Sequence, residues 1–308
     1  MSLLEVRDLT VRDSLTGALI VRDVHFCLER GTCLGVVGES GSGKSLTCLA
    51  LLGLAPPSLR VSGSVRFGGI DLLQAGRETV RGIRGKRIAM IVQQPMTAFD
   101  PLYSMGAQLL ETLRATTSAF SEKESRGRIV EALEMMHIHN PLDVLKKYPY
   151  QLSGGMLQRC MIAVALLQRP DIIIADEPIS ALDMSIRAQV LNLLRHLQKE
   201  RGITYLFIAH DLSVMRYISD RIAVIHKGDI VELADAEELV THAIHPYTRS
   251  LLSAIPMPDP RRERQKKLLV YDPSMHDYST EAPQWRELRP RHWVLCSASE
   301  AEDWCRES

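Results

Sequence analysis

Residues 38–45 have the order G-x-x-x-x-G-K-S. Glycines in this order let the backbone curl so that successive N–H groups point at the oxygens of a phosphate. The lysine reaches the β- and γ-phosphates, and the hydroxyl that follows it is a ligand for Mg²⁺. The stretch therefore predicts a phosphate-binding loop, or P-loop, made of Gly38, Glu39, Ser40, Gly41, Ser42, Gly43, Lys44 and Ser45.

Two carboxylates, Asp176 and Glu177, follow the apolar run 172–175. A buried strand that ends in this way matches the Walker B arrangement, in which the first acid holds Mg²⁺ through water and the second polarises the attacking water. In a chain without a P-loop, the same pattern would equally indicate a strand that ends in solvated acids. Beside residues 38–45, the pattern favours the catalytic interpretation.

Ser153, Gly154 and Gly155 precede an apolar, helix-forming run. A serine and two glycines at a helix start can bind an anion for the same reasons as the P-loop, although an ordinary capped helix has the same pattern. Three further polar residues come at or soon after the ends of predicted strands: Gln93, Asp183 and His210. Ligand-binding groups of open α/β sheets gather at the carboxyl ends of the strands.

The elements that must position these residues alternate between strands and helices, which predicts a mainly parallel sheet covered on both faces. The predicted strands are 33–37, 87–93, 171–176 and 204–209, and the predicted helices are 46–54, 105–116, 121–136 and 185–200. Ser121 and Glu124 have capping-box spacing. Residues 2–11 are expected to form an edge strand, with further strands at 20–28 and within 61–73, and a hairpin at 222–232.

The organisation of the chain changes in two places. Residues of about 100–165 form a helical insert in an otherwise α/β chain, and the composition shifts near residue 255. The alternating prolines there indicate a linker, namely Pro256, Pro258 and Pro260. A basic run follows at 261–267, and all three tryptophans come after it. The sequence contains no internal repeat, so one cassette is expected rather than two.

Bulk composition excludes several classes of protein. The formal net charge of the 308 residues is zero, which gives no general attraction to nucleic acid or anionic lipid. No apolar run approaches the ~18 residues that span a bilayer, and charged residues within the first ten exclude a signal peptide, so a cytosolic chain is expected unless a partner holds it at a membrane. The six cysteines form no C-x-x-C pair, which argues against a disulfide framework or a zinc site.

Taken in order, these motifs resemble the ATP-binding subunit of an ABC transporter over residues 1–255. The resemblance implies an α/β P-loop NTPase with a RecA-like core, an antiparallel β subdomain, a helical subdomain at about 95–157 and a C-terminal extension at 256–308. It implies that ATP and Mg²⁺ bind, with the ion held by Ser45, Gln93 and Asp176. Glu177, His210 and Gln93 would serve hydrolysis, His210 by contacting the γ-phosphate and Gln93 by sensing metal, water and the membrane partner.

The resemblance also implies partners. Ser153, Gly154 and Gly155 would clamp the ATP of a second ABC ATPase subunit, either identical or paralogous, and Asp183 would line the seam between the two. Two membrane permeases would bind at the helical insert near Gln93, and an extracytoplasmic solute-binding protein would act indirectly. The chain would then be peripheral to the cytoplasmic side of the membrane, with no nucleic acid bound.

Finer features are similar to the dipeptide, oligopeptide and nickel importer ATPases, namely residues 37–45, 94–96, 148–149 and 245–252. Residues 45–48 and 153–159 are more similar to the nickel type, whereas residues 255–278 are similar to oligopeptide-type ATPases of Gram-positive bacteria. These two similarities disagree, so the sequence does not decide between the cargoes. The alternative is a soluble ABC-type ATPase of DNA repair or translation. Such proteins usually carry coiled-coil arms, zinc modules or two cassettes, and this sequence shows none of these.

The sequence departs from the family pattern in three places. The signature serine and glycines are followed by Met156 instead of glutamine, and no aromatic residue precedes Phe26 to stack on adenine. Many relatives bind an iron–sulfur cluster through four cysteines in the extension, but only Cys296 and Cys305 lie here, so no cluster is predicted.

Residues 135–139, with two histidines and two methionines, are expected to form a surface turn rather than a metal site.

Overall fold

The computed structural model describes residues 2–116, 121–255, 261, 266–276, 278–279 and 281–307. The chain divides into two compact units. Unit 1 comprises residues 29–32 and 75–207, and unit 2 comprises residues 2–28, 33–74 and the described residues from 208 onward. The P-loop belongs to unit 2 and the Walker B carboxylates to unit 1.

Unit 1 is built on three strands in the order β8-β7-β6, and β6 runs parallel to β7 with Ile88 opposite Ile172. Every residue of β7 is buried, which explains why its first four residues are all apolar. The strands are β6 (Ile88–Ile91), β7 (Ile172–Asp176) and β8 (Thr204–Ile208). The helices are α2 (Arg77–Ile83), α3 (Pro95–Ala98), α4 (Met105–Thr116), α5 (Glu122–Met135), α6 (Pro141–Val144), η1 (Pro149–Gln151), α7 (Gly154–Leu167) and α8 (Met184–Arg201).

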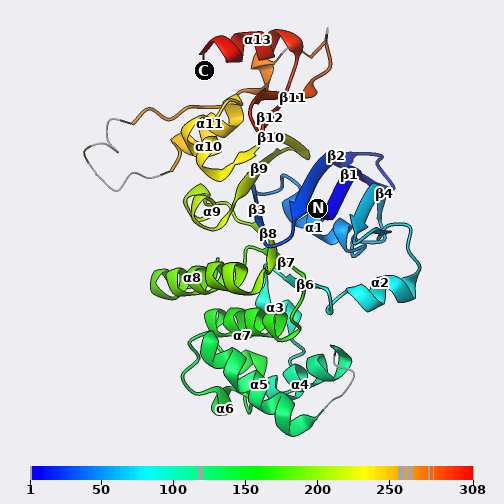
Figure 1. Ribbon diagram of the computed structural model, residues 1–308, viewed down its shortest axis with the longest axis vertical. Coiled ribbons are helices and arrows are strands. Elements are labelled where there is room, and N and C mark those ends of the chain that lie inside the picture. Colours follow the sequence, from blue (N-terminus) through cyan, green and yellow to red (C-terminus); the bar gives the residue numbers. More distant parts are fainter. Residues whose placement is uncertain are drawn as a thin grey trace. The chain divides into compact units, whose positions relative to one another are not determined.

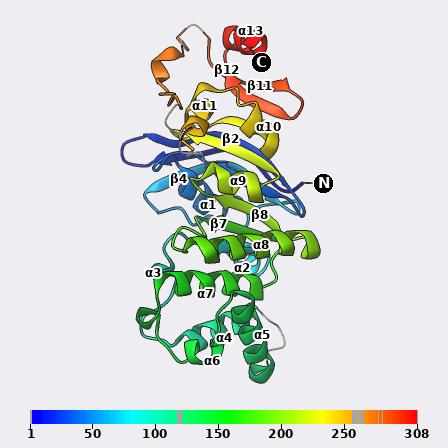
Figure 2. The same cartoon turned by 90° about the vertical axis from the view of Figure 1, so that its left-hand side faces the viewer.

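Helix α7 is the centre of the helical part of unit 1. It contacts α3, α4 and α5, and Figure 2 shows these helices gathered around it. The helix α4 turns Met105, Leu109 and Leu113 inward at four-residue spacing, as an amphipathic helix should. The predicted helices 105–116 and 121–136 are confirmed within one residue at each end.

Unit 2 contains an antiparallel sheet with the strand order β2-β1-β4-β5. The strands are β1 (Ser2–Asp13), β2 (Leu19–Glu29), β4 (Leu59–Phe67) and β5 (Ile70–Asp71). The prediction that residues 2–11 form an edge strand is wrong, because β1 lies between β2 and β4. The apolar alternation of β1 shows which face is buried but carries no information about how many neighbours pair with the strand.

The other strands of unit 2 follow the order β11-β12-β10-β9-β3, in which β3 and β9 are parallel (Figure 1). They are β3 (Cys33–Val37), β9 (Arg221–His226), β10 (Asp229–Asp235), β11 (Gln284–Arg289) and β12 (His292–Cys296). The helices are α1 (Lys44–Leu51), α9 (Leu212–Ile218), α10 (Ala236–Thr241), α11 (Pro246–Ser253), η2 (Pro273–Met275) and α13 (Ala298–Glu307). The predicted hairpin at 222–232 is confirmed as β9 and β10, joined at Lys227 and Gly228.

Ser121 stands at the N-cap of α5, but its side chain makes no capping hydrogen bond, so the predicted capping box is wrong. The boundary expected near residue 255 adjoins residues 256–260, and the linker prolines, Arg262 and Arg264 lie outside the described residues. The division between a cassette and an extension at this point therefore stays a prediction.

Candidate functional site

The P-loop follows the fully buried strand β3 and runs directly into α1. Gly38 has a φ of 156°, and a Cβ on it would lie 2.1 Å from the carbonyl oxygen of Ile225 at the end of β9. Only glycine fits this close approach. Ser40 and Gly41 are exposed at the outer part of the loop, where a phosphate could reach their N–H groups.

Lys44 is 6% exposed, and its ammonium group turns back into the loop. Its Nζ donates to the carbonyl oxygens of Gly38 at 2.8 Å and Glu39 at 2.7 Å. A cation is thus fixed inside a curl of backbone at the start of a helix, which suits an anionic ligand. The contact of Lys44 with the β- and γ-phosphates stays a prediction.

The Walker B carboxylates end β7 in unit 1. Asp176 is the last, buried residue of the strand, and Glu177 follows it with a φ of 48°. The side chain of Gln93, which follows β6, donates from Nε2 to Oε2 of Glu177 at 3.0 Å. Because β6 and β7 are parallel neighbours, their carboxyl ends bring these two predicted residues together.

The predicted signature residues begin α7. Ser153 caps the helix by accepting from the N–H of Met156 at 3.3 Å, and both Ser153 and Gly154 are exposed. A Cβ on Gly155 would lie 3.3 Å from the carbonyl oxygen of Ala181, so the start of α7 lies against the segment that follows β7. Asp183 is exposed at the end of that segment, where its carboxylate caps α8 by accepting from the N–H of Ile186.

Gln158 is a site residue that the sequence analysis missed. It is fully buried on α7, and its Nε2 donates to the carbonyl oxygen of Glu177 at 3.4 Å. A glutamine in a helical apolar run carries no signal of this contact, because the contact depends on how α7 packs beside β7. This contact supports the backbone of Glu177.

His210, the remaining predicted residue, lies in unit 2 and is exposed immediately before α9. The next residue, Asp211, caps α9 by accepting from the N–H groups of Ser213 and Val214. This cap fixes the start of α9, and it therefore helps to fix the position of His210, which lies between β8 and that helix.

Two other groups bear on metal binding. His137 and His139 are exposed in the turn after α5, as the sequence predicted for residues 135–139. Among the described residues, one set of three metal-type ligands lies within 4.8 Å, namely Asp8, Asp23 and His25. The Nε2 atom of His25 lies 3.4 Å from a carboxylate oxygen of each acid, which is the geometry of an exposed ion pair.

Two family models match this chain. The model described as "ABC transporter" matches residues 21–180, and the model described as "Oligopeptide/dipeptide transporter, C-terminal region" matches residues 231–280. Within the described part of the chain, no helix combines the length and apolar character needed to cross a bilayer.

Several curated proteins are similar over most of their length. The oligopeptide transport ATP-binding protein OppF of Streptococcus pyogenes serotype M1 is 44% identical over 309 residues, covering 99% of this chain and 98% of its own. AmiF of Streptococcus pneumoniae serotype 4, with the same description, is 45% identical over 97% of this chain and 96% of its own. The metal-staphylopine import system ATP-binding protein CntD of Staphylococcus aureus strain NCTC 8325 is 43% identical over 82% of this chain and 93% of its own.

Among solved structures, a dimeric post-hydrolysis state of the ATP-binding cassette MJ0796, bound to ADP and Pi, is similar in fold. The TM-score is 0.69 at 28% sequence identity, and the similarity covers 76% of this chain and 98% of that chain.

Proposed function

Because this chain belongs to the ABC transporter family, we propose that it is the subunit that powers import of oligopeptides by hydrolysing ATP. ATP binding and hydrolysis follow from the family itself. The observation that supports oligopeptides as the cargo is the similarity to OppF, which covers almost the whole of both chains. The staphylopine relative matches less of this chain. The match of residues 231–280 to oligopeptide and dipeptide transporters supports the same cargo class.

The chemistry assigned to the site is positioning and charge stabilisation, as in other phosphoryl transfers to water. Lys44 and the N–H groups of the P-loop would neutralise the phosphate oxygens. Glu177 would orient the attacking water and accept its proton, since Gln93 fixes the carboxylate at 3.0 Å. His210 would contact the γ-phosphate.

Mg²⁺ is assigned to Ser45, Gln93 and Asp176. A hydroxyl, an amide and a carboxylate offer the hard oxygen ligands that this ion prefers, so the donor set fits it. When bound, the ion would supply positive charge to the phosphate oxygens, and the protein's part would be to offer these three oxygen ligands.

A second ATPase subunit is assigned to the exposed residues Ser153, Gly154 and Asp183, together with Gly155. Helix N-termini that lie at a surface can bind phosphate oxygens of a nucleotide held elsewhere. The dimeric solved relative supports a facing copy.

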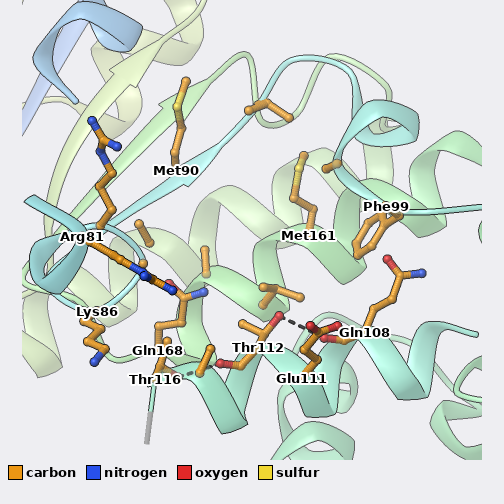
Figure 3. A pocket seen from close by; sticks show the side chains of 18 of the residues that line it. Arg81, Lys86, Met90, Phe99, Gln108, Glu111, Thr112, Thr116, Met161 and Gln168 are labelled. Carbon is orange, nitrogen blue, oxygen red and sulfur yellow. Dashed lines mark hydrogen bonds between the residues drawn. The ribbon is translucent and has the colours of Figure 1, made fainter. Parts of the chain in front are cut away.

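The membrane permeases are assigned to a cavity of about 1100 Å³ in unit 1. Its wall combines apolar side chains of β6, α7 and the segment after α3 with charged ones of α2 and α4, and Figure 3 shows Met90, Phe99, Met161, Arg81 and Glu111 among them. Val92, the residue before Gln93, also lines it. An amphipathic helix of a permease would fit such a groove and would bear on the strand that carries Gln93.

This assignment places the chain on the cytoplasmic side of the membrane as a peripheral subunit. A solute-binding protein would act only through the permeases, and the neutral net charge gives no support for binding nucleic acid. The alternative of an ATPase in DNA repair or translation gains nothing from the relatives reported above, which are named for transport.

The cargo is tested by uptake in cells whose only copy of this chain is supplied from a plasmid. We expect the wild-type chain to restore uptake of a labelled tetrapeptide, and the Glu177→Gln variant to lower it by at least about tenfold because hydrolysis drives transport. Glu200→Gln, an exposed change on α8, is the control and should transport normally. Restored uptake of nickel alone, with no peptide uptake, would contradict the proposed cargo.

A further inference from the structure

The residue Glu39 of the P-loop is fixed on both sides of its backbone. Its N–H donates to the hydroxyl oxygen of Tyr247 at 3.1 Å. Its carbonyl oxygen accepts from Lys44 Nζ at 2.7 Å and from the N–H of Ser42 at 3.2 Å. One of these partners, Tyr247, lies 208 positions further along the chain and is not part of the loop.

The hydroxyl of Tyr247 is itself placed with little freedom. The residue is 1% exposed in the first turn of α11, where its own N–H donates to Nδ1 of His245. Its ring lies 4.2 Å from the ring of His226, the last residue of β9. Burial raises the pKa of Tyr247 to about 12, so the hydroxyl stays neutral at physiological pH.

Behind Tyr247 lies a cluster of rings contributed by the C-terminal segment. Tyr271 lies 5.4 Å from the ring of Tyr247 and 5.1 Å from that of His226. His276 stacks on His245 at 5.2 Å, and its Nδ1 pairs with Glu300 of α13. A continuous series of packed side chains therefore leads from α13 to the P-loop, all within unit 2.

We propose that Tyr247 is a positioning residue for the P-loop, and that the C-terminal segment around Tyr271 sets the affinity for ATP by keeping Tyr247 in place. The inference deepens the proposed function, since it assumes that ATP binds at residues 38–45. It gives the segment after residue 266 a role at the nucleotide site.

The first test removes only the hydroxyl, by Tyr247→Phe in the full-length chain within its transporter complex. Loss of one neutral hydrogen bond should raise the Kd for ATP about fivefold, while kcat at saturating ATP stays within about twofold. The N–H of Glu39 should exchange with deuterium faster in the nucleotide-free state, which a merely structural role of Tyr247 would not produce. An unchanged Kd together with unchanged exchange in the P-loop peptide would overturn the role of Tyr247.

The second test addresses the C-terminal segment through two variants of Tyr271. Tyr271→Ala removes the ring behind Tyr247 and should raise the Kd for ATP and the exchange at Glu39 in the same direction as Tyr247→Phe. Tyr271→Phe keeps the ring and should behave as wild type. Tyr217→Ala, at a ring on α9 that is 41% exposed, is the control.

Wild-type affinity and exchange in Tyr271→Ala would overturn the part assigned to the C-terminal segment. That failure is distinguishable from failure of the proposed function, which would appear in the unaltered chain as an absence of ATP-driven peptide uptake. A Tyr271→Phe variant as impaired as Tyr271→Ala would also contradict the inference, because the ring would then not be the part that matters.

Discussion

At the scale of single residues, Glu177 combines a strained backbone with several contacts that hold it. Its φ of 48° lies in the left-handed region, which costs a residue with a side chain roughly 1 kcal/mol or more. Its carbonyl oxygen accepts from Ser180 N–H at 3.3 Å, Ser180 Oγ at 3.0 Å and Gln158 Nε2 at 3.4 Å. With Gln93 on the carboxylate, the proposed catalytic group is fixed at both its backbone and its side chain.

Some residues of the candidate site could be predicted from the sequence, and others could not. Lys44, Asp176 and Glu177 were predicted because their chemical types and spacing match a known use. Gln158 contacts Glu177, 19 positions away, and Tyr247 contacts Glu39, 208 positions away. These contacts depend on tertiary packing, which no local sequence pattern reveals. Tyr247 stood in a stretch noted only for its resemblance to related importers.

Burial makes His245 a source of pH-dependent stability. Desolvation is the largest cause that lowers the pKa of His245 to about 3, and the neighbouring His276 and His226 act in the same direction. The usual pKa of histidine in the unfolded chain is about 6.5. The unfolded state therefore binds a proton first as the pH falls, and stability present above pH 6.5 is lost progressively toward pH 3. The expected loss between pH 7 and pH 5 is about 2 kcal/mol from this residue.

The variant His245→Asn tests this expectation, since asparagine can still accept from the N–H of Tyr247 at the start of α11 but does not titrate. Unfolding by urea at pH 7 and pH 5 should show a decline in stability that is smaller in the variant by about the same amount. An equal decline in both proteins would mean that His245 is not the group responsible.

At the scale of elements, the hairpin of β11 and β12 extends the strands of unit 2 beyond β10. It carries part of a small buried cluster formed by Ile244, Val294, Cys296 and Trp304. The sequence analysis did not predict this hairpin, because the six residues of β11 are largely polar and only partly buried. The strands β3 and β7 were predicted since both faces of each are covered and every residue is buried.

Two tryptophans of this region should respond differently to truncation. Trp304 on α13 is 9% exposed and Trp293 on β12 is 37% exposed. Trp304→Ala would leave a cavity in the cluster and should lower the free energy of unfolding by about 3 kcal/mol, whereas Trp293→Ala should cost roughly 1 kcal/mol or less. Circular dichroism during urea unfolding measures both, and equal effects would contradict the packing described for α13.

At the scale of the whole molecule, the proposed role in an importer requires the membrane permeases to hold this chain at the membrane. The cavity between α2, α4, β6 and α7 is the surface to which the permeases are assigned. Membrane association should therefore depend on this one groove and on the presence of the permeases.

Filling the groove tests that dependence. Thr112 of α4 lines the cavity (Figure 3), and Thr112→Trp should lower the membrane-bound fraction about tenfold or more, because overpacking costs on the order of 1–3 kcal/mol. Ala107→Trp, exposed on the same helix outside the cavity, is the matched control. Sedimentation with membranes that contain the permeases measures the fraction. Equal sedimentation of both variants would place the docking surface elsewhere.

The proposed role of Glu177 is checked by the rate of ATP hydrolysis in the Glu177→Gln variant of the assembled transporter, with ATP binding measured in parallel. Glutamine keeps the shape of the side chain beside Gln93 but cannot accept a proton from water. We expect the rate to fall about 10²- to 10⁴-fold while ATP still binds with nearly wild-type affinity. Turnover at the wild-type rate would show that Glu177 is not the catalytic base.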